Sequence, residues 1–375
     1  MRTDELDFDL PEALIATHPV EPRDASRLLV VSRSEPDRIE DRVFTDLPDL
    51  LEPGDLMVFN RSRVLPARLR GRVRDTGGGV DALYLHAAPD DACRWTVLVN
   101  AKRPRAGRVI DLLDAEGCPT GDTFELIARC EDAEGGGAWH ARVHPRAGGD
   151  PLGVLERAGR VPLPPYIRAQ RRSRGEPIED RRDADQYQTT YASETDAGSI
   201  AAPTAGLHFT DRVLAALASR GIERDEVTLH VGVGTFKPIE TERVEDHAMH
   251  EEWCTLGPAR ARFERGKPGS GRVIGVGSTS VRTLEAYALE HERSGTRPDS
   301  LRTDILIAPG HGWRWVDGMV TNFHLPRSTL LAMVAAALET PGGPSGVERV
   351  RGVYDHAIRS GYRFYSYGDA MLILP

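Results

Sequence analysis

Residues 67–148 constrain the fold of this chain more than any other stretch. Short runs of alternating apolar and polar residues follow one another there, separated by clusters of Gly, Asp and Pro, with no run of helical period. These runs cover residues 68–74, 80–86, 95–99, 109–113, 124–129 and 139–143. Several short strands at this spacing predict a small antiparallel sheet or barrel. The sequence therefore predicts a β module in the middle of the chain.

Strand and helix patterns alternate on both sides of this module. Apolar runs predict strands at residues 28–31, 55–59, 227–231, 304–307 and 363–374, the last of them interrupted at Gly368. Runs of helical period predict helices at residues 211–220, 328–338 and 347–359. Such alternation is typical of an α/β domain with a parallel or mixed sheet.

We therefore predict two domains. Residues 1–66 and 149–375 form a discontinuous α/β catalytic domain with a mixed sheet, and residues 67–148 form an inserted small antiparallel β-barrel domain. The arginine-rich stretch at residues 168–183 is predicted to be a charged, mobile loop.

Composition excludes several classes of protein. The 375 residues include 40% hydrophobic and 28% charged residues, as in soluble globular proteins. A net charge of −9 argues against indiscriminate coating of nucleic acid, although it allows a local basic patch. The four cysteines form no C-x-x-C pair, and the longest apolar run, residues 330–338, is too short to span a bilayer. With no signal-peptide pattern at the N-terminus, a cytoplasmic protein is expected.

Histidines, glycines and carboxylates gather in residues 200–210, 229–236 and 245–251. Glycines allow close approach of the backbone to a ligand, and imidazoles and carboxylates are the groups that transfer protons. These segments match neither an ordinary helix nor a strand. We therefore predict a site built from loops at strand ends.

Three patterns have alternative interpretations. The turn at residues 275–280, between a predicted strand and helix, either holds an anion or is a tight turn with a Ser or Thr cap. His247 and His250, beside carboxylates, offer metal ligands or a structural, substrate-orienting role; the second is favoured because no third ligand has recognisable spacing. His324 is compatible with a core histidine and with a catalytic one.

Arginines are concentrated in two stretches of the chain. Each set is compatible with phosphate contacts or with a solvated charged face. The arginines stand at positions 61, 63, 68, 70, 72 and 74, and at 168, 171, 172 and 174.

Longer motifs in the chain resemble one known family from end to end. They include Glu21-Pro-Arg-Asp-Ala-Ser-Arg-Leu, Ala202-Pro-Thr-Ala-Gly-Leu-His-Phe, Leu229-His-Val-Gly-Val-Gly-Thr-Phe, Ser278-Thr-Ser-Val-Arg-Thr-Leu-Glu and Thr321-Asn-Phe-His-Leu-Pro. In this order they resemble the S-adenosylmethionine:tRNA ribosyltransferase-isomerase family of queuosine biosynthesis. Arg61 departs from the pattern, because the family usually has a small acidic or amide residue there.

The resemblance implies a tRNA-modifying transferase and isomerase. Such an enzyme transfers the ribosyl part of S-adenosylmethionine onto 7-aminomethyl-7-deazaguanine at the tRNA wobble position and isomerises it. Epoxyqueuosine-tRNA, adenine and methionine are the products. The resemblance further implies an α/β domain with an inserted barrel, S-adenosylmethionine as co-substrate without a prosthetic group, and no metal. We also expect no membrane association and a monomer.

The site residues follow from the resemblance and the chemistry together. Candidate catalytic residues are His208, His230, Asp246, His250 and His324, with His208 or Asp246 as general base. Candidate substrate-binding residues are Asn60, Arg63, Thr204, Gly206, Gly232, Gly234, Ser278, Thr279, Arg282 and Asn322.

Two finer assignments concern S-adenosylmethionine itself. Arg282, with the turn of Ser278 and Thr279, is expected to hold the methionine carboxylate. The sulfonium is expected to rest on an aromatic face, that of Phe209, Phe236 or Phe323. A non-catalytic RNA-binding protein and an enzyme acting on a small nucleoside are the rival functions.

Overall fold

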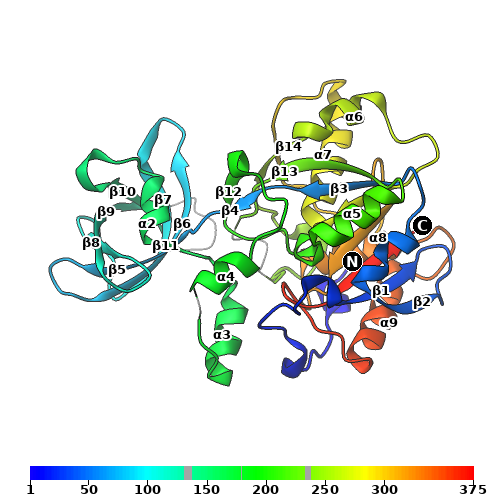
Figure 1. Cartoon of the computed structure of the whole chain (residues 1–375), viewed down its shortest axis with the longest axis horizontal. Helices are drawn as coiled ribbons and strands as arrows, with labels where there is room; N and C mark the ends of the chain where they lie inside the picture. Colours follow the sequence, from blue (N-terminus) through cyan, green and yellow to red (C-terminus); the bar gives the residue numbers. More distant parts are fainter. Residues whose placement is uncertain (131–136, 179, 233–237) are drawn as a thin grey trace.

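The computed structural model describes residues 1–130, 137–178, 180–232 and 238–375. The chain forms a large α/β part and a smaller β-barrel that lie side by side along the long axis of the molecule (Figure 1). Helices α3 (Pro165–Arg174) and α4 (Asp180–Gln186) lie between and below the two parts in this view.

One mixed sheet of nine strands organises the described residues of the α/β part. Its order is β16 (Leu301–Thr303), β14 (Glu252–Thr255), β13 (Glu223–Leu229), β3 (Leu56–Asn60), β15 (Val273–Val276), β17 (Gly318–Asn322), β18 (Ala370–Leu374), β1 (Arg27–Ser32) and β2 (Ile39–Val43). Strands β13, β3, β15 and β17 are mutually parallel. Antiparallel pairing of β14 to β13 and of β18 to β17 ends this parallel block on either side.

Helices cover both faces of the sheet, so its strands are apolar on both sides. In β1, Leu28 and Val30 point into one core, and Leu29 and Val31 point into the other. Helices α1 (Leu47–Leu50) and α5 (Asp211–Ser219) pack on the first face. The second face is covered by α6 (Arg260–Arg265), α7 (Gly277–Ser294), α8 (Thr329–Leu338) and α9 (Gly346–Arg359). Across the described residues, no helix combines the length and apolar character that crossing a membrane requires.

Short 3-10 turns connect many of these elements. Those in the described residues are η1 (Thr3–Leu6), η2 (Glu12–Leu14), η3 (Arg23–Ala25), η4 (Phe44–Asp46), η5 (Arg146–Gly148), η6 (Glu194–Asp196), η7 (Thr204–His208), η9 (Val244–Asp246) and η10 (Gly257–Ala259).

The smaller part is a closed antiparallel barrel of six strands among the described residues. Around the barrel they are β5 (Arg68–Val73), β6 (Gly79–Ala88), β7 (Asp91–Ala101), β10 (Ala138–His144), β9 (Pro119–Arg129) and β8 (Val109–Leu113), and β8 pairs again with β5. Alternate side chains fill its interior, where the Tyr84 and Trp95 rings meet edge to face at 4.9 Å. The predicted fold class, an α/β part with a mixed sheet and a small antiparallel barrel, is confirmed.

Two short connections join the barrel to the large part. The chain enters after β4 (Arg63–Val64), which pairs with β12 (Ala197–Ser199), and returns through α2 (Gly153–Ala158) and β11 (Gly159–Arg160). Gly159 has to be glycine, because a Cβ there would lie 1.9 Å from the Pro66 carbonyl oxygen. Helix α2 packs into the barrel core, beyond the expected end at residue 148. The limits 67–148 therefore stay a prediction.

The predicted mobile loop at residues 168–183 is wrong, because helices α3 and α4 occupy most of this stretch. Arg171 explains the difference. Its side chain is only 1% exposed, its Nη1 donates to Asp183 Oδ2 at 2.8 Å, and its Nε donates to the Thr17 carbonyl at 3.2 Å. The arginine-rich pattern suggested solvation, whereas this arginine is a buried link between the two helices and the N-terminal segment.

A buried ion pair ties α2 to the barrel. The Asp122 side chain is 0% exposed and receives Arg157 Nε at 2.9 Å and Nη2 at 2.8 Å, together with the Arg146 backbone N–H. Burial works to raise the pKa of Asp122, but the hydrogen bonds from Arg157 and Arg146 outweigh it and hold this pKa below its ordinary value.

We expect Arg157→Leu to lower the free energy of unfolding by about 2–4 kcal/mol, because it leaves a buried carboxylate without its cation. Urea denaturation followed by tryptophan fluorescence measures the change. Arg94→Leu is the matched control in the same barrel, since it removes an exposed i,i+4 pair with Asp90 that contributes at most about 1 kcal/mol. Equal losses in the two variants would contradict a special contribution from the buried pair.

Candidate active site

The candidate site lies at the carboxyl ends of the parallel block of the sheet. Because these strands run in one direction, the residues that follow them share one edge, where ligands of open α/β sheets bind. His230 follows β13, Asn60 ends β3, Ser278 follows β15 through Gly277, and His324 follows β17. Residues that are far apart in the sequence are thus brought together by the topology.

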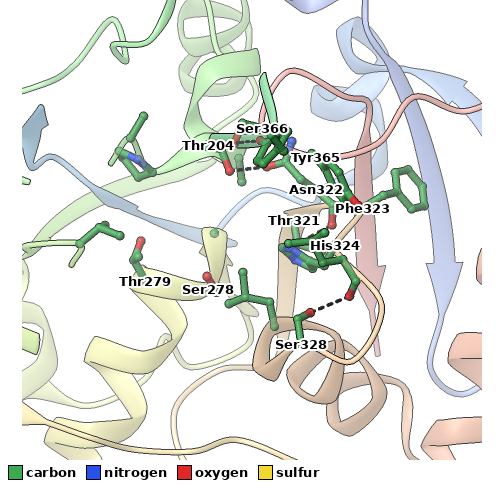
Figure 2. A pocket seen from close by; sticks show the side chains of 18 residues that line it. Thr204, Ser278, Thr279, Thr321, Asn322, Phe323, His324, Ser328, Tyr365 and Ser366 are labelled. Carbon is green, nitrogen blue, oxygen red and sulfur yellow. Dashed lines mark hydrogen bonds between the residues drawn. The ribbon is translucent and has the colours of Figure 1, made fainter. Parts of the chain in front are cut away.

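A first hollow opens at this edge (Figure 2). Figure 2 shows Ser278 and Thr279 on one side and Thr321, Asn322 and His324 on the other, with Thr204 nearby. The remaining side chains of its wall are mainly apolar or aromatic. They are Tyr166, Ala202, Pro203, Ala205, Val231, Phe323, Leu325, Leu330 and Tyr365, with Gly277, Ser328 and Ser366 completing the lining.

Two further hollows adjoin the first. Leu330 lines both the first and the second hollow, and Gly232 lines both the second and the third. The second contains His247, His250 and Arg282 beside apolar residues of α8 and of residues 305–307. The third lies between the barrel and residues 162–165 and is about 490 Å³ in volume. Together they form a row that leads from the sheet edge to the barrel.

His208 lies behind the first hollow in a closed hydrogen-bond network. Asn322 Nδ2 donates to His208 Nε2 at 3.1 Å, which leaves the Nδ1 proton of the neutral ring to donate to Ser26 Oγ at 2.8 Å. Asn322 Oδ1 accepts from Thr204 Oγ1 at 2.9 Å. His208 is 4% exposed, and burial, helped by Arg363 and Arg23, lowers its pKa to about 3. The neutral imidazole therefore orients Asn322 and, through it, Thr204.

His324 lines the first hollow directly. Its Nε2 lies 2.8 Å from Thr321 Oγ1, and its backbone N–H donates to the Tyr354 hydroxyl at 2.9 Å. Burial lowers the pKa of His324 to about 3, so this ring is also neutral near pH 7. It offers hydrogen bonds to a ligand in the hollow without adding a charge.

His230 is held on three sides. Its Nδ1 lies 2.9 Å from Ser62 Oγ, and its ring stacks on Trp253 with centroids 4.8 Å apart. A Cβ on Gly198 would lie 2.6 Å from the ring, so only glycine fits there. Burial lowers the pKa of His230, and the charge of Asp196 opposes this shift. Asp196 in turn pairs with Arg61 at 2.9 Å, the position at which the chain departs from the family pattern.

The N-terminus of α7 presents unused donors to the first hollow. Val276 precedes the helix and supplies no side-chain cap. The Thr279 hydroxyl is buried and has no hydrogen-bond partner in the described structure, although the residue lines the hollow. A buried unsatisfied hydroxyl costs free energy unless a ligand completes it. Together with the uncapped first turn, it favours an electron-rich ligand group at this point.

Arg282 lies one turn further along α7 and lines the second hollow instead. Its Nη1 donates to Glu252, whose other oxygen accepts the Gly232 N–H at 3.1 Å. Arg282 Nε and Nη2 are buried and have no partner among the described residues. The expected cluster of Arg282 with Ser278 and Thr279 is therefore spread over two adjoining hollows.

Other candidate residues have different surroundings. Asn60 is 0% exposed and clamps β13, because its Oδ1 accepts from Leu229 N at 3.1 Å and its Nδ2 donates to Leu229 O at 3.0 Å. Gly206 packs against Tyr191, whose hydroxyl would lie 2.0 Å from an added Cβ. Arg63 is half-buried on β4.

The last candidates lie around the second hollow. His250 is half-buried and lines it, whereas the Asp246 side chain at the end of η9 is exposed and lines none of the three hollows. Gly234 lies outside the described residues, as does Phe236. Among the residues that the structure describes, no group of three or more His, Cys, Asp or Glu is arranged to hold a metal ion.

Sequence reasoning missed Tyr365 and Ser366 because it assigned residues 363–374 to one strand. Strand β18 begins only at Ala370, and the preceding loop lines the first hollow. Tyr365 has φ of 72°, a strained value for a residue with a side chain, and its N–H donates to the Phe323 carbonyl at 2.9 Å. The interruption at Gly368 was the available signal, since its Cβ would lie 2.5 Å from the Arg363 carbonyl oxygen.

A pH dependence follows from the buried neutral ring of His208. Its pKa falls from an ordinary 6.5 to about 3 on folding, so the unfolded chain takes up a proton that the folded chain excludes. The contribution of neutral His208 to the free energy of unfolding is complete above about pH 6.5, and it is lost progressively as the pH falls towards about 3. We expect His208→Gln to make this loss shallower, by at most about 1.4 kcal/mol per pH unit.

Urea denaturation between pH 7 and about 4 measures the two slopes. His144→Gln, which replaces an exposed imidazole of the barrel, is the control for histidine loss itself. Identical slopes for wild type and His208→Gln would show that the folded protein accepts a proton at His208.

The chain matches known proteins over its whole length. The family model described as queuosine biosynthesis protein matches residues 3–373. A protein from Novosphingobium aromaticivorans named S-adenosylmethionine:tRNA ribosyltransferase-isomerase is 45% identical, covering 100% of this chain and 100% of that protein. A protein of the same name from Gloeobacter violaceus is also 45% identical, covering 100% of this chain and 96% of the relative.

A solved structure is similar as well. The crystal structure of S-adenosylmethionine tRNA ribosyltransferase from Thermotoga maritima shares 31% sequence identity, covers 99% of this chain and 100% of that chain, and has a TM-score of 0.49. The family resemblance predicted from the motifs is confirmed by the family model and the curated relatives. The chain therefore belongs to the queuosine biosynthesis protein family, and its curated relatives are named as an enzyme.

Proposed function

We propose that this chain transfers the ribosyl part of S-adenosylmethionine to 7-aminomethyl-7-deazaguanine at the tRNA wobble position and isomerises it to epoxyqueuosine. Adenine and methionine leave. One observation carries the proposal: two adjoining hollows each contain buried donors that have no partner among the described residues. These donors are Thr279 Oγ1 in the first hollow and Arg282 Nε and Nη2 in the second. The names of the relatives support a ribosyl transfer from S-adenosylmethionine to tRNA together with an isomerisation.

The groups of S-adenosylmethionine suit the side chains that line these two hollows. Its adenosine part suits the first hollow, where aromatic walls adjoin the hydroxyls of Ser278 and Thr279. Its methionine part suits the second, where apolar residues lead to Arg282. A guanidinium with two unused N–H groups binds a carboxylate strongly and directionally. S-adenosylmethionine is thus a co-substrate, and no prosthetic group is required by this scheme.

Tyr365 supplies the aromatic face of this arrangement, because the Phe323 ring is 0% exposed and packs against the rings of Tyr354, Tyr362 and Phe364. Both residues line the first hollow, but the ring of Phe323 points away from it in Figure 2. A sulfonium is attracted to the face of an aromatic ring in a desolvated site. Of the three phenylalanines considered for this role, Phe323 alone lines the first hollow among the residues that the structure describes.

The histidines divide into two groups under this proposal. His208 and His324, with pKa values of about 3, are weak bases near pH 7 and serve as neutral hydrogen-bond partners. We assign to His208 a positioning role through Asn322, in place of the base expected earlier. His250, half-buried in the second hollow, is the candidate for removing the acidified C5′ proton, because that hollow adjoins the first. Asp246 is less suited because its side chain is exposed.

The proposal is tested by adenine release. The protein is incubated with S-adenosylmethionine and tRNA that carries the aminomethyl-deazaguanine, and free adenine and the modified nucleoside are quantified by liquid chromatography and mass spectrometry. Adenine together with epoxyqueuosine is expected. Adenine release with the free nucleoside but not with tRNA would favour the small-nucleoside enzyme, and tRNA binding without adenine would favour a non-catalytic RNA-binding protein.

Thr279→Val tests the site of S-adenosylmethionine. Valine keeps the shape and removes the hydroxyl, so we expect KM for S-adenosylmethionine to rise about three- to tenfold while KM for tRNA stays unchanged. Thr283→Val is the matched control one turn along α7, because its hydroxyl already donates to the Thr279 carbonyl at 2.9 Å. Unchanged KM for S-adenosylmethionine in Thr279→Val would exclude a contact from this hydroxyl.

A further inference from the structure

A strongly basic hollow lies on the barrel, outside the site described above. It is lined by residues of β5, β6, β7 and α3, so both the barrel and the helix beside it contribute. It contains one carboxylate, Asp81, and six basic side chains: Arg68, Arg70, Arg72, Lys102, Arg168 and Arg172. On a chain of net charge −9, this concentration of positive charge is a local exception.

Asp81 is already neutralised by two of these cations. Arg68 donates to it through Nε at 3.0 Å and Nη2 at 2.7 Å, and Arg168 Nη2 donates at 3.1 Å. Arg72, Lys102 and Arg172 are exposed, and their charged groups have no ion-pair partner in the described part of the chain. The hollow therefore presents unneutralised positive charge to solvent.

The cations are arranged in rows rather than scattered. Arg68, Arg70 and Arg72 alternate with core residues along β5, so they lie on the outer face about 7 Å apart. Arg168 and Arg172 are one turn apart on α3 and share a face of that helix. Rows of cations at such spacing suit the regularly repeated phosphates of a nucleic acid strand.

The basic hollow is continuous with the candidate active site. It shares Arg68, Asp81 and Arg168 with the third hollow, which reaches Gly232 and so the second hollow. The third hollow is lined largely by apolar side chains, such as Leu83, Leu98 and Leu163. Unstacked bases of a single-stranded loop suit such a surface, whereas a duplex does not enter it.

We propose that Arg72, Lys102 and Arg172 form a phosphate-binding surface for tRNA. It holds the backbone of the RNA on the barrel, while the third hollow receives unstacked bases and guides the target nucleotide to the sheet edge. This inference rests on the proposed function for the identity of the RNA. Its physical basis is independent of the reaction: Arg72, Lys102 and Arg172 are exposed cations without an ion pair among the described residues, and they line a hollow that adjoins the site.

The experiment compares the triple variant Arg72→Gln, Lys102→Gln, Arg172→Gln with a matched control, Arg265→Gln, Arg293→Gln, Arg359→Gln. The control removes the same charge from exposed arginines of α6, α7 and α9, away from the barrel. Fluorescence anisotropy measures Kd for tRNA over a range of salt concentrations. Thermal unfolding verifies that both variants are folded, as expected for exposed side chains.

We expect the barrel variant to bind tRNA roughly tenfold or more weakly at low salt, and the slope of log K against log salt to fall by about 2–3. The control variant should keep most of the wild-type affinity. In adenine release, the barrel variant should raise KM for tRNA and leave KM for S-adenosylmethionine unchanged. Equal affinities and slopes for the two variants would overturn the inference.

Two further outcomes separate the inference from its alternatives. If the wild type releases no adenine but tRNA binding still depends on the three cations, the proposed function fails and the surface stands. If the barrel variant loses binding to phosphatidylserine vesicles while keeping its affinity for tRNA, the surface is one for anionic membranes and the inference fails.

Discussion

The buried charges of α7 are the constraint on which the rest of the structure depends. Glu285 is 0% exposed and accepts the backbone N–H groups of Trp315 and Val316 at 2.9 and 2.8 Å, so it fixes the segment that leads into β17. One turn earlier, Arg282 pairs with Glu252 of β14. Removing one member of such a pair leaves an uncompensated buried charge, a cost of several kcal/mol. The helix that starts at the candidate site thus also determines how the sheet around it is held.

The same helix connects stability to the proposed chemistry. In the described part of the chain its first turn has no side-chain cap, and neither the Thr279 hydroxyl at the first hollow nor Nε and Nη2 of Arg282 at the second has a hydrogen-bond partner. A buried donor without an acceptor costs free energy, and a ligand that accepts its hydrogen bond recovers this cost. Under the proposed function these donors are already in place before the ligand binds, so the site is preorganised. His208 acts on the opposite wall, where its neutral ring fixes the amide of Asn322.

Much of the fold is predictable from the sequence because its signals are local. Alternation of apolar and polar residues at 68–143 predicts the barrel, and alternation of strand and helix patterns outside it predicts the α/β domain with its mixed sheet. Two predictions of secondary structure were wrong, one because a charged side chain is buried and one because the backbone is strained. Arg171 in α3 is buried despite its arginine-rich neighbours, and the segment before Ala370 leaves the sheet at a strained Tyr365. Neither burial nor backbone strain is visible in a local pattern.

For the site, the sequence by itself determined the residue types and the segments in which they stand. It predicted that Ser278, Thr279 and His324 belong to the site, since they follow apolar strands. Only the tertiary structure decided which side chains meet. It placed Arg282 with Glu252 in a hollow separate from Ser278, and it buried His208 behind Asn322. The physical reason is that pairing and burial depend on partners distant in the chain, which parallel strands bring to one edge only once the whole sheet has formed.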